Sequence, residues 1–378
     1  MHTSKKIKVI FAGIYPEKKN TAAYNRFLAT VKMVKASFEC EVVMPERYVL
    51  KNRILKGLVA RALFFRQIIK TFLTLDKKNY NHIVFFKFSD PMMCLICWFF
   101  TKPMNIKLAL ERNEFPSPFI AEKNNRIKKT LYTWFVLTWQ FRLFDALFLM
   151  TDELIEFYGR YAKKKSVIQK LPMTVDFSRF GSPASHQKDA YIFYAGSLSE
   201  RKDGVESLIN AFNKVSVAYP HISLKIAGGA KGGEEKLASI VKTLSLEGKV
   251  HFLGFVGREE IPDYLCSAKI VVLPRPDSRQ ARGGFPTKLG EYLASGRPVI
   301  ATKVGEISEY LSENDIFFIS PDNIKAELVE KMNYILSNYD QALVVAERGK
   351  YVAKNYFSLE ANQDFIKRAF ESVFSREI

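Results

Sequence analysis

The chain has 378 residues, of which 48% are hydrophobic and 25% charged. These values are typical of a soluble globular protein that is long enough for two domains. Lys and Arg exceed Asp and Glu so strongly that the formal net charge is +18, and the pI is about 9.5. The excess indicates a negatively charged partner, either nucleic acid, an anionic membrane surface or a phosphorylated substrate.

The four cysteines are too few and too scattered for a disulfide framework, which favours a reducing compartment. Cys94 and Cys97 form a CxxC within the apolar run "PMMCLICWFF", without a second Cys or His pair. Core packing is therefore favoured over metal binding or redox chemistry, and we assign these thiols no role.

No segment has the pattern of a secretory signal or a membrane span. The N-terminal stretch lacks a long apolar region with a cleavage site. The apolar stretch at 131–150 is long enough to span a bilayer, but Arg142 and Asp145 interrupt it. We therefore expect a cytoplasmic protein, in solution or at the inner face of the cell membrane.

The first half alternates short β-branched or aromatic runs with longer segments of helical period. This alternation predicts βαβ units and a parallel sheet. The expected strands are "IKVIFAG", "CEVVMP", "HIVFFKF", "IKLALER" and "ALFLMT", and the expected helices are 21–36, 51–75, 91–101, 126–142 and 152–162.

A second α/β unit begins at Tyr191. Its expected strands are "YIFYAG", "ISLKIAGG", "VHFLGFV", "KIVVLP", "RPVIAT" and "IFFIS", with helices at 204–219 and 234–246 and one that carries Glu291. In the helix at 204–219 one apolar face recurs at a spacing of three and four, through Val205, Leu208, Ile209, Phe212 and Val215.

The predicted fold class is α/β, with two Rossmann-like doubly wound domains that face a cleft, where such folds bind ligands. We expect domains at 1–178 and 179–355, and a C-terminal helix at 356–378 that packs back towards the first domain. The polar segment "SRFGSPASHQKDA" indicates the linker.

The segment "YAGSLSERKDG" follows the first strand of the second half and precedes a helix. A strand, a glycine turn and a helix N-terminus direct backbone N–H groups at an anion, and Lys202 can add a charge. A solvated lysine before a helix is the simpler alternative.

The segment "GGFPTKLGEY" repeats this pattern. Its glycines permit close approach of the backbone, Thr287 can cap the helix or donate to an oxygen, and Lys288 supplies charge. Glu291 lies one turn beyond Lys288, and its carboxylate can accept both vicinal hydroxyls of a ribose. Phosphate together with ribose indicates a nucleotide, and an exposed Lys288–Glu291 ion pair is the alternative.

The second half resembles the retaining GT-B glycosyltransferases of the group-1 (family 4) class. The resemblance extends from Leu171 to the end of the chain, in the order and spacing of "LPMTVDFSRF", "YAGSLSERKDGVESLINAF", "LKIAGGAKGGEEKL", "VHFLGFVGREEIPDYLCSAKIVVLPR", "KLGEYLASGRPVIATKVGEISEYL" and "YFSLEANQDFIKRAF".

The resemblance implies a site for a nucleotide-sugar donor, with UDP as the default carrier and no metal or further cofactor. Lys202 binds the diphosphate and Glu291 the ribose. Backbone groups around Phe255 and Val256 read the base. Further donor contacts are implied for Gly196, Ser197, Gly284, Phe285, Thr287, Lys288 and Leu289. Lys202 and Lys288 are implied as the groups that stabilise the leaving diphosphate.

Two departures from the family pattern concern the donor site. Ser197 occupies a place where the family often has arginine, so one phosphate charge is expected from Lys288 or Arg201. Gly283 stands where the family's Glu-x7-Glu pair has its first carboxylate, which only a gap would allow Asp277 to replace.

The first half resembles the family only weakly. Arg26 opens a helix from which it can reach donor phosphates, and a solvated arginine is the alternative. Glu111 and Glu114 lie where many relatives have a histidine, so a carboxylate can orient the acceptor hydroxyl, and we assign Glu114 a catalytic role. The alternative is that these carboxylates pair with Arg112.

The implied function is a retaining glycosyltransferase that extends a lipid-linked or polysaccharide acceptor in bacterial surface-glycan synthesis. The alternatives are a nucleotide-sugar-binding or partner protein without turnover, and an epimerase of similar architecture. The basic helices at 51–75 and 126–142 carry apolar and aromatic residues, which favours peripheral contact with an anionic membrane. Alternatively, their apolar faces pack on the sheet. We expect no nucleic-acid partner, because the charge comes without a recognised module.

Overall fold

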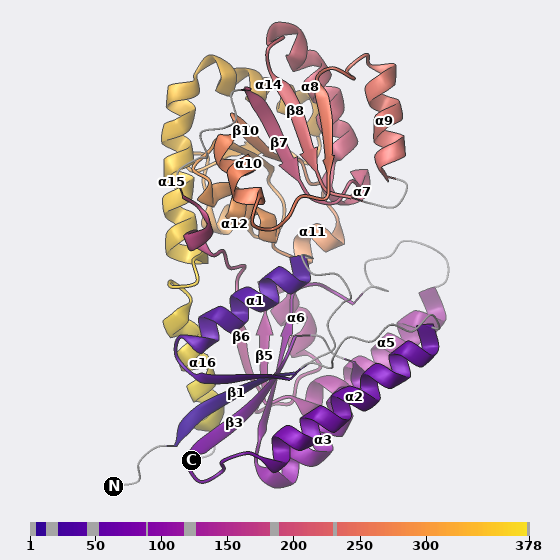
Figure 1. Ribbon diagram of the computed structural model, residues 1–378, viewed down its shortest axis with the longest axis vertical. Coiled ribbons are helices and arrows are strands. Elements are labelled where there is room, and N and C mark those ends of the chain that lie inside the picture. The colour runs from indigo at the N-terminus through magenta and orange to yellow at the C-terminus, as the bar shows by residue number, and fades with distance from the viewer. Residues whose placement is uncertain are drawn as a thin grey trace. The chain divides into compact units, whose positions relative to one another are not determined.

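The computed structural model describes residues 5–12, 22–43, 53–87, 90–116, 126–181, 189–229 and 233–375. Its contacts divide the chain into two compact units (Figure 1). The first comprises residues 1–172 and 362–378, and the second residues 173–361. These divisions lie a few residues from the boundaries expected at 178 and 355.

The first unit contains a parallel six-stranded sheet in the order β2-β1-β3-β4-β5-β6. Its inner strands are nearly continuous apolar runs because helices cover both faces of the sheet. The strands are β1 (Lys6–Ala12), β2 (Glu39–Val43), β3 (Tyr80–Phe86), β4 (Lys107–Arg112), β5 (Ala146–Leu149) and β6 (Val167–Lys170).

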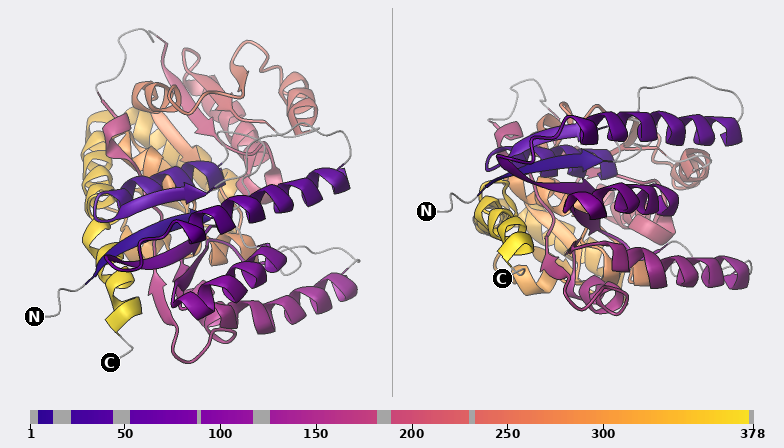
Figure 2. Two further views of the ribbon diagram at one scale, coloured as in Figure 1. Left: turned by 60° about the horizontal axis from the view of Figure 1, so that its bottom comes forward. Right: turned by 90° about the horizontal axis from the view of Figure 1, so that it is seen from below.

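The helices of the first unit form two layers around this sheet. One face meets α1 (Ala22–Lys35) and the C-terminal helix α16 (Gln363–Ser375), whose Phe370 lies 5.8 Å from Phe85 and 5.2 Å from Phe148 between ring centroids. The other face meets the neighbouring helices α2 (Arg53–Leu73), α3 (Pro91–Thr101) and α5 (Arg126–Gln140) (Figure 2). The unit also contains α6 (Asp152–Gly159), η1 (Lys102–Met104) and η2 (Phe141–Leu143).

The second unit has a parallel sheet in the order β12-β11-β10-β7-β8-β9. The strand order reverses between β7 and β10, and α/β folds bind ligands outside the carboxyl ends of their strands at such a point. The strands are β7 (Tyr191–Ala195), β8 (Ser223–Ala227), β9 (Val250–Gly254), β10 (Ile270–Leu273), β11 (Val299–Thr302) and β12 (Phe317–Ile319).

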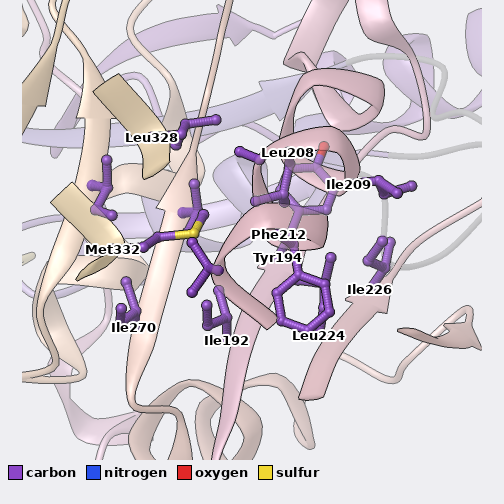
Figure 3. Close-up of a cluster of buried hydrophobic side chains, with 14 of the residues drawn as sticks. Ile192, Tyr194, Leu208, Ile209, Phe212, Leu224, Ile226, Ile270, Leu328 and Met332 are labelled. Atoms are coloured by element: carbon purple, nitrogen blue, oxygen red, sulfur yellow. The ribbon is translucent and has the colours of Figure 1, made fainter. Parts of the chain in front are cut away.

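Helices α8 (Val205–Ala218) and α14 (Ile324–Ser337) pack on one face of this sheet (Figure 3). The five apolar residues expected to form the buried face of the helix at 204–219 are all buried, which confirms that prediction. The remaining helices are η3 (Phe177–Arg179), α7 (Glu200–Asp203), α9 (Gly233–Thr243), α10 (Ile261–Ser267), α11 (Arg279–Gly283), α12 (Thr287–Ala294), α13 (Ile307–Tyr310) and α15 (Tyr339–Phe357).

Sequence reading missed strand β6. It is four residues long, lies at the edge of the sheet, and buries only Val167 fully. A short edge strand with one buried residue lacks the apolar run by which the other strands were found. Among the described residues, no helix is long and apolar enough to cross a membrane.

The connection between α7 and α8 depends on Gly204, which has a φ of 68°. A Cβ atom at this position would lie 1.9 Å from the carbonyl oxygen of Pro274, just beyond β10. The left-handed conformation and this close approach both require glycine.

We predict that Gly204→Ala destabilises the protein by at least about 2 kcal/mol, through backbone strain and a clash with main-chain atoms. Gly248→Ala is the matched control, since nothing lies within 4 Å of a Cβ there, and it should change stability by less than about 0.5 kcal/mol. Denaturant unfolding measures both, and equal stability of the two variants would contradict the assignment.

Candidate functional site

The loops that follow β7, β8 and β9 meet through their backbones. Gly196 donates its N–H to the carbonyl oxygen of Ala227 at 2.9 Å, and Gly228 donates to that of Gly254 at 2.7 Å. A Cβ atom on Gly228 would lie 1.8 Å from the carbonyl oxygen of Gly196. Only a residue without a side chain allows this approach. Gly196, the glycine of the "YAG" turn, follows β7 directly and therefore lies at the reversal point of the sheet.

Lys288 extends over this glycine turn. Its Nζ lies 3.2 Å from Oδ2 of Asp203 and 3.3 Å from the hydroxyl of Tyr194, to which it donates. A Cβ atom on Gly196 would lie 2.0 Å from the same nitrogen. The lysine predicted to supply charge at the second motif is therefore placed beside the first motif.

The site has an excess of positive charge. Burial lowers the pKa of the Lys288 ammonium, Asp203 opposes this effect, and the charges of Arg275 and Lys202 lower the pKa further. Lys288 thus pairs with the buried carboxylate of Asp203, while the charges of Arg275 and Lys202 act on the same ammonium. Such a set of groups is suited to binding an anion rather than a metal cation.

The N-terminus of α12 differs from the expectation for Thr287. Pro286 occupies the N-cap position without a side-chain cap, and Thr287 is the first helical residue, so it does not cap the helix. Tyr292 ties the helix to the end of β7, because its hydroxyl donates to the carbonyl oxygen of Ala195 at 2.8 Å and accepts from the N–H of the same residue at 3.0 Å. The uncapped helix start is a suitable position for an anion.

The side chains of two residues of the Gly284–Leu289 loop are packed in the core. Phe285 packs on Tyr310 and Phe357, with ring centroids 5.7 and 5.3 Å apart, and Leu289 is fully buried. The N–H of Leu289 donates to the carbonyl oxygen of Pro286 at 2.9 Å. This N–H is therefore already used inside the turn, which argues against its predicted role as a phosphate donor.

Glu291 is held by Arg179. The guanidinium pairs with Oε1 of Glu291 and donates a second hydrogen bond to the carbonyl oxygen of Arg258. Lys288 and Glu291 therefore have different partners, and the alternative of a Lys288–Glu291 ion pair is wrong. Sequence reading missed Arg179 because it lies in the segment interpreted as a linker, although "LPMTVDFSRF" belongs to the family resemblance.

The other predicted donor-site residues also lie at the carboxyl edge of the second sheet. Lys202 has an exposed side chain, and its N–H donates to the hydroxyl of Ser199 at 3.3 Å. The carbonyl oxygen of Ser197 accepts from the Tyr194 hydroxyl at 2.7 Å. Phe255 follows β9 and is 66% exposed, next to the half-buried Val256.

Asp277 pairs with Arg282, with Oδ1 and Nε 3.6 Å apart. Its substitution for the missing first carboxylate of the Glu-x7-Glu pair stays a prediction.

The first unit has a buried charge cluster where Glu111 was expected to meet an acceptor. Arg26 donates to Oε1 of Glu111 at 2.6 Å, and Lys87 pairs with the same oxygen. The other two guanidinium nitrogens of Arg26 donate to the carbonyl oxygens of Pro172 and Leu171 at 2.9 and 3.0 Å. Neither Glu111 nor Arg26 is accessible, so both ligand-binding expectations for these two residues are wrong.

Glu114 is exposed, and its backbone oxygen accepts from the Tyr158 hydroxyl at 3.0 Å. Because Glu114 belongs to the first unit, its predicted catalytic role is separate from the geometry of the second-unit site and stays a prediction.

Several titratable groups of the first unit have strongly shifted pKa values, among them Cys94 and Lys87. Burial raises the pKa of the Cys94 thiol to about 12, so this thiol is a poor nucleophile. Burial lowers the pKa of Lys87 from 10.5 to about 7, with Glu111 acting in the opposite direction and Arg26 in the same one.

We predict that Lys87→Met removes part of the protein's pH dependence. Between about pH 7 and 10 the unfolded chain binds a proton at Lys87 that the folded chain does not, so wild-type stability should rise with pH in this window. The variant keeps the Arg26–Glu111 pair and should lack this rise. Unfolding experiments across the window measure it, with Lys78→Met as the exposed control. Parallel curves for the wild type and Lys87→Met would contradict the prediction.

The second unit matches a known family. Residues 189–338 match the family described as "Glycosyl transferases group 1". Mannosylfructose-phosphate synthase of Agrobacterium fabrum is 31% identical over 178 residues, which cover 43% of this chain and 37% of that protein. The chain spans less than half the length of the first curated relatives that it matches.

Solved structures resemble nearly the whole chain. Sucrose-phosphate synthase from Thermosynechococcus elongatus has a TM-score of 0.72 at 15% identity, covering 99% of this chain and 100% of that one. Anabaena Alr3699/HepE in complex with UDP-glucose has a TM-score of 0.69 at 14% identity, covering 97% and 100%. At this identity the likeness shows the fold, which is GT-B. Residues 189–338 of the second unit are thus similar to the group 1 glycosyl transferases.

Proposed function

We propose that the protein is a retaining glycosyltransferase that takes its sugar from a nucleotide sugar, with a UDP-sugar as the donor. The observation that carries this proposal is the arrangement at the reversal point of the second sheet. There, Lys288 pairs with the buried Asp203, the charges of Lys202 and Arg275 act on the same ammonium, and α12 begins without a side-chain cap. A diphosphate supplies the negative charge that this arrangement lacks. The similar Anabaena protein, which is known with UDP-glucose bound, supports the choice of donor.

The catalytic task is the departure of the nucleoside diphosphate. The bond between the anomeric carbon and the diphosphate oxygen breaks, and its electron pair leaves with the diphosphate. The acceptor oxygen forms the new bond on the same face of the sugar, and its proton passes to the leaving diphosphate oxygen. Negative charge develops on the leaving diphosphate, and fixed cations stabilise it without reorganisation. Lys288 is suited to this task because Asp203 and Tyr194 hold its ammonium in place.

The remaining donor contacts are proposed for residues at the same carboxyl edge of the second sheet. Glu291, positioned by Arg179, accepts the ribose hydroxyls. Phe255 and Val256 lie beside the base. The glycine turn at Gly196 and Ser197 and the start of α12 offer backbone groups to the phosphates. Lys202 lies near Lys288 and adds a second charge to the diphosphate.

The acceptor is proposed to be a lipid-linked saccharide or a growing polysaccharide in bacterial surface-glycan synthesis, with Glu114 orienting its hydroxyl. The basic helix α2 supports the proposal that the protein acts at the surface of an anionic membrane. Its Arg66 and Lys70 are exposed and Arg61 pairs with Asp90, whereas Phe64 and Ile68 are buried. The apolar face of the described part of α2 therefore packs inward and its cations face solvent, so α2 offers charge to a membrane. The side chains of 51–58 and 126–130 lie outside the described residues.

A panel of nucleotide sugars tests the donor assignment. A ligand at 100 times its Kd should stabilise the fold by about 2.7 kcal/mol, which a thermal shift detects. Transfer or slow hydrolysis of the stabilising donor then identifies an enzyme. Binding without turnover at any donor concentration would favour a nucleotide-sugar-binding protein, and interconversion of the donor without an acceptor would favour an epimerase.

We predict that Glu291→Ala weakens donor binding by about 1.5–3 kcal/mol, because ribose loses a charged acceptor. Glu291→Gln keeps one acceptor oxygen and should lose less. Glu313→Ala, an exposed glutamate of the same unit, is the control and should bind the donor like the wild type. Calorimetric titration with the stabilising donor measures all three, and wild-type affinity in Glu291→Ala would remove the ribose assignment.

We predict that reversing the charges of α2 with Arg66→Glu and Lys70→Glu weakens binding to anionic vesicles at low salt. Each cation near the surface contributes about 1 kcal/mol. The control is Lys214→Glu with Lys242→Glu, two exposed lysines of the second unit that give the same net charge. Vesicle sedimentation measures the difference. If the two double variants sediment equally, the effect follows net charge and not α2.

A further inference from the structure

The described helices α3 and α5 expose apolar residues on one face each. On α3 these are Met92, Leu95 and Phe99, which are 39–69% exposed and lie three and four residues apart. The opposite face of α3 carries the buried Met93, Cys94 and Cys97. The sequence therefore predicted burial correctly for the CxxC, but α3 is apolar on its outer face as well.

Helix α5 likewise has one exposed apolar face and one buried face. Leu131, Trp134 and Phe135 are 54–61% exposed and lie three and four residues apart, while Leu137 is buried. Aromatic side chains that fill a helix face exposed to water leave a large apolar area without a partner. Scattered single apolar residues are ordinary on protein surfaces, but two such faces are not.

The two faces belong to neighbouring helices, since α3 packs against both α2 and α5 (Figure 2). Phe65 of α2 and Phe100 of α3 lie 5.8 Å apart between ring centroids. All three tryptophans of the chain, Trp98, Trp134 and Trp139, lie on α3 and α5. Tryptophan is enriched where a protein meets the interface between lipid and water.

The charges near these faces are mostly positive, although Asp90 caps the start of α3 and pairs with Arg61 of α2. Helix α2 contains five Lys or Arg residues and no Asp or Glu, and α5 contains three and none. Helix α3 contains no charged residue, and directly after it the Nζ of Lys102 lies 4.6 Å from the ring centroid of Trp98. An apolar surface flanked by cations complements an anionic bilayer, whose headgroups attract the cations and whose acyl boundary accepts the apolar side chains.

We propose that the exposed apolar faces of α3 and α5 enter the acyl boundary of an anionic membrane, while the cations of α2 contact its headgroups. This inference rests on the membrane contact proposed above and deepens it, because it assigns the apolar part of the contact to named residues. In this arrangement the described helices lie on the bilayer, and none of them is long and apolar enough to cross it. The apolar part of the binding does not depend on salt, whereas attraction by α2 fades within a Debye length of about 3 Å at 1 M salt.

Tryptophan fluorescence of the full chain tests the inference directly, because all three tryptophans lie on these helices. Vesicles of mixed phosphatidylcholine and phosphatidylglycerol should shift the emission to shorter wavelength. The same vesicles with brominated acyl chains should quench it, and a bound fraction should survive transfer to high salt.

The variant Phe99→Ser with Phe135→Ser replaces one exposed aromatic residue on each helix. It should lose the fraction that resists salt and most of the quenching, and keep binding at low salt through α2. The matched control is Val217→Ser with Tyr351→Ser, two residues of the second unit that are 81% and 70% exposed. This control should behave like the wild type, and both double variants should keep the thermal shift given by the donor.

Absence of quenching by brominated lipid, or equal resistance to salt in the wild type and Phe99→Ser/Phe135→Ser, would overturn the inference. A dimer that this variant dissociates would overturn it as well, since the occupant of the surface would then be a second copy of the chain. Failure of the donor to shift the melting temperature would contradict the proposed glycosyl transfer and leave the membrane result standing. The two failures are thus distinguishable.

Discussion

The close approach of main chains at the carboxyl edge of the second sheet is the constraint on which the candidate site depends. Gly228 lies against the carbonyl oxygen of Gly196, and Gly204 lies against that of Pro274, at distances that no Cβ atom can occupy. These contacts bring the ends of β7, β8 and β10 together. The Nζ of Lys288 then rests over Gly196, a position that a side chain at residue 196 would fill. The proposed contact of a phosphate with backbone N–H groups and a lysine requires this absence of side chains.

The two units differ in how the charged groups beside their sheets are paired. In the first unit two cations share the fully buried Glu111, and Arg26 also satisfies two backbone carbonyls. This cluster is closed, and breaking one partner of such a pair leaves a buried charge uncompensated. In the second unit Lys288 pairs with Asp203, the charges of Arg275 and Lys202 act on this lysine, and Lys202 is exposed. Only the second arrangement leaves positive charge for a ligand.

The sequence predicted the parallel sheets and the buried face of α8 because both have strong local patterns, a continuous apolar run or a helical period. It also placed Lys288 and Glu291 on one helix. It did not reveal Asp203, Tyr194 or Arg179 as their partners, since these contacts join residues 85–112 positions apart. Ion pairing between distant segments has no local signature. The buried state of Arg26 and Glu111 was missed for the same reason, because each residue alone is equally compatible with solvent.

The outer faces of α3 and α5 show a different limit of sequence reading. A helix that covers one face of a sheet needs a single apolar stripe, as α2 has, with exposed cations on its outer side. Helix α3 has no charged residue on any side, which in a soluble α/β unit is normally a sign of complete burial. The structure buries only one side of it, against the sheet and its neighbours. The outer side of α3 therefore lacks an apolar environment within the described residues, which is the feature that the proposed bilayer contact accounts for.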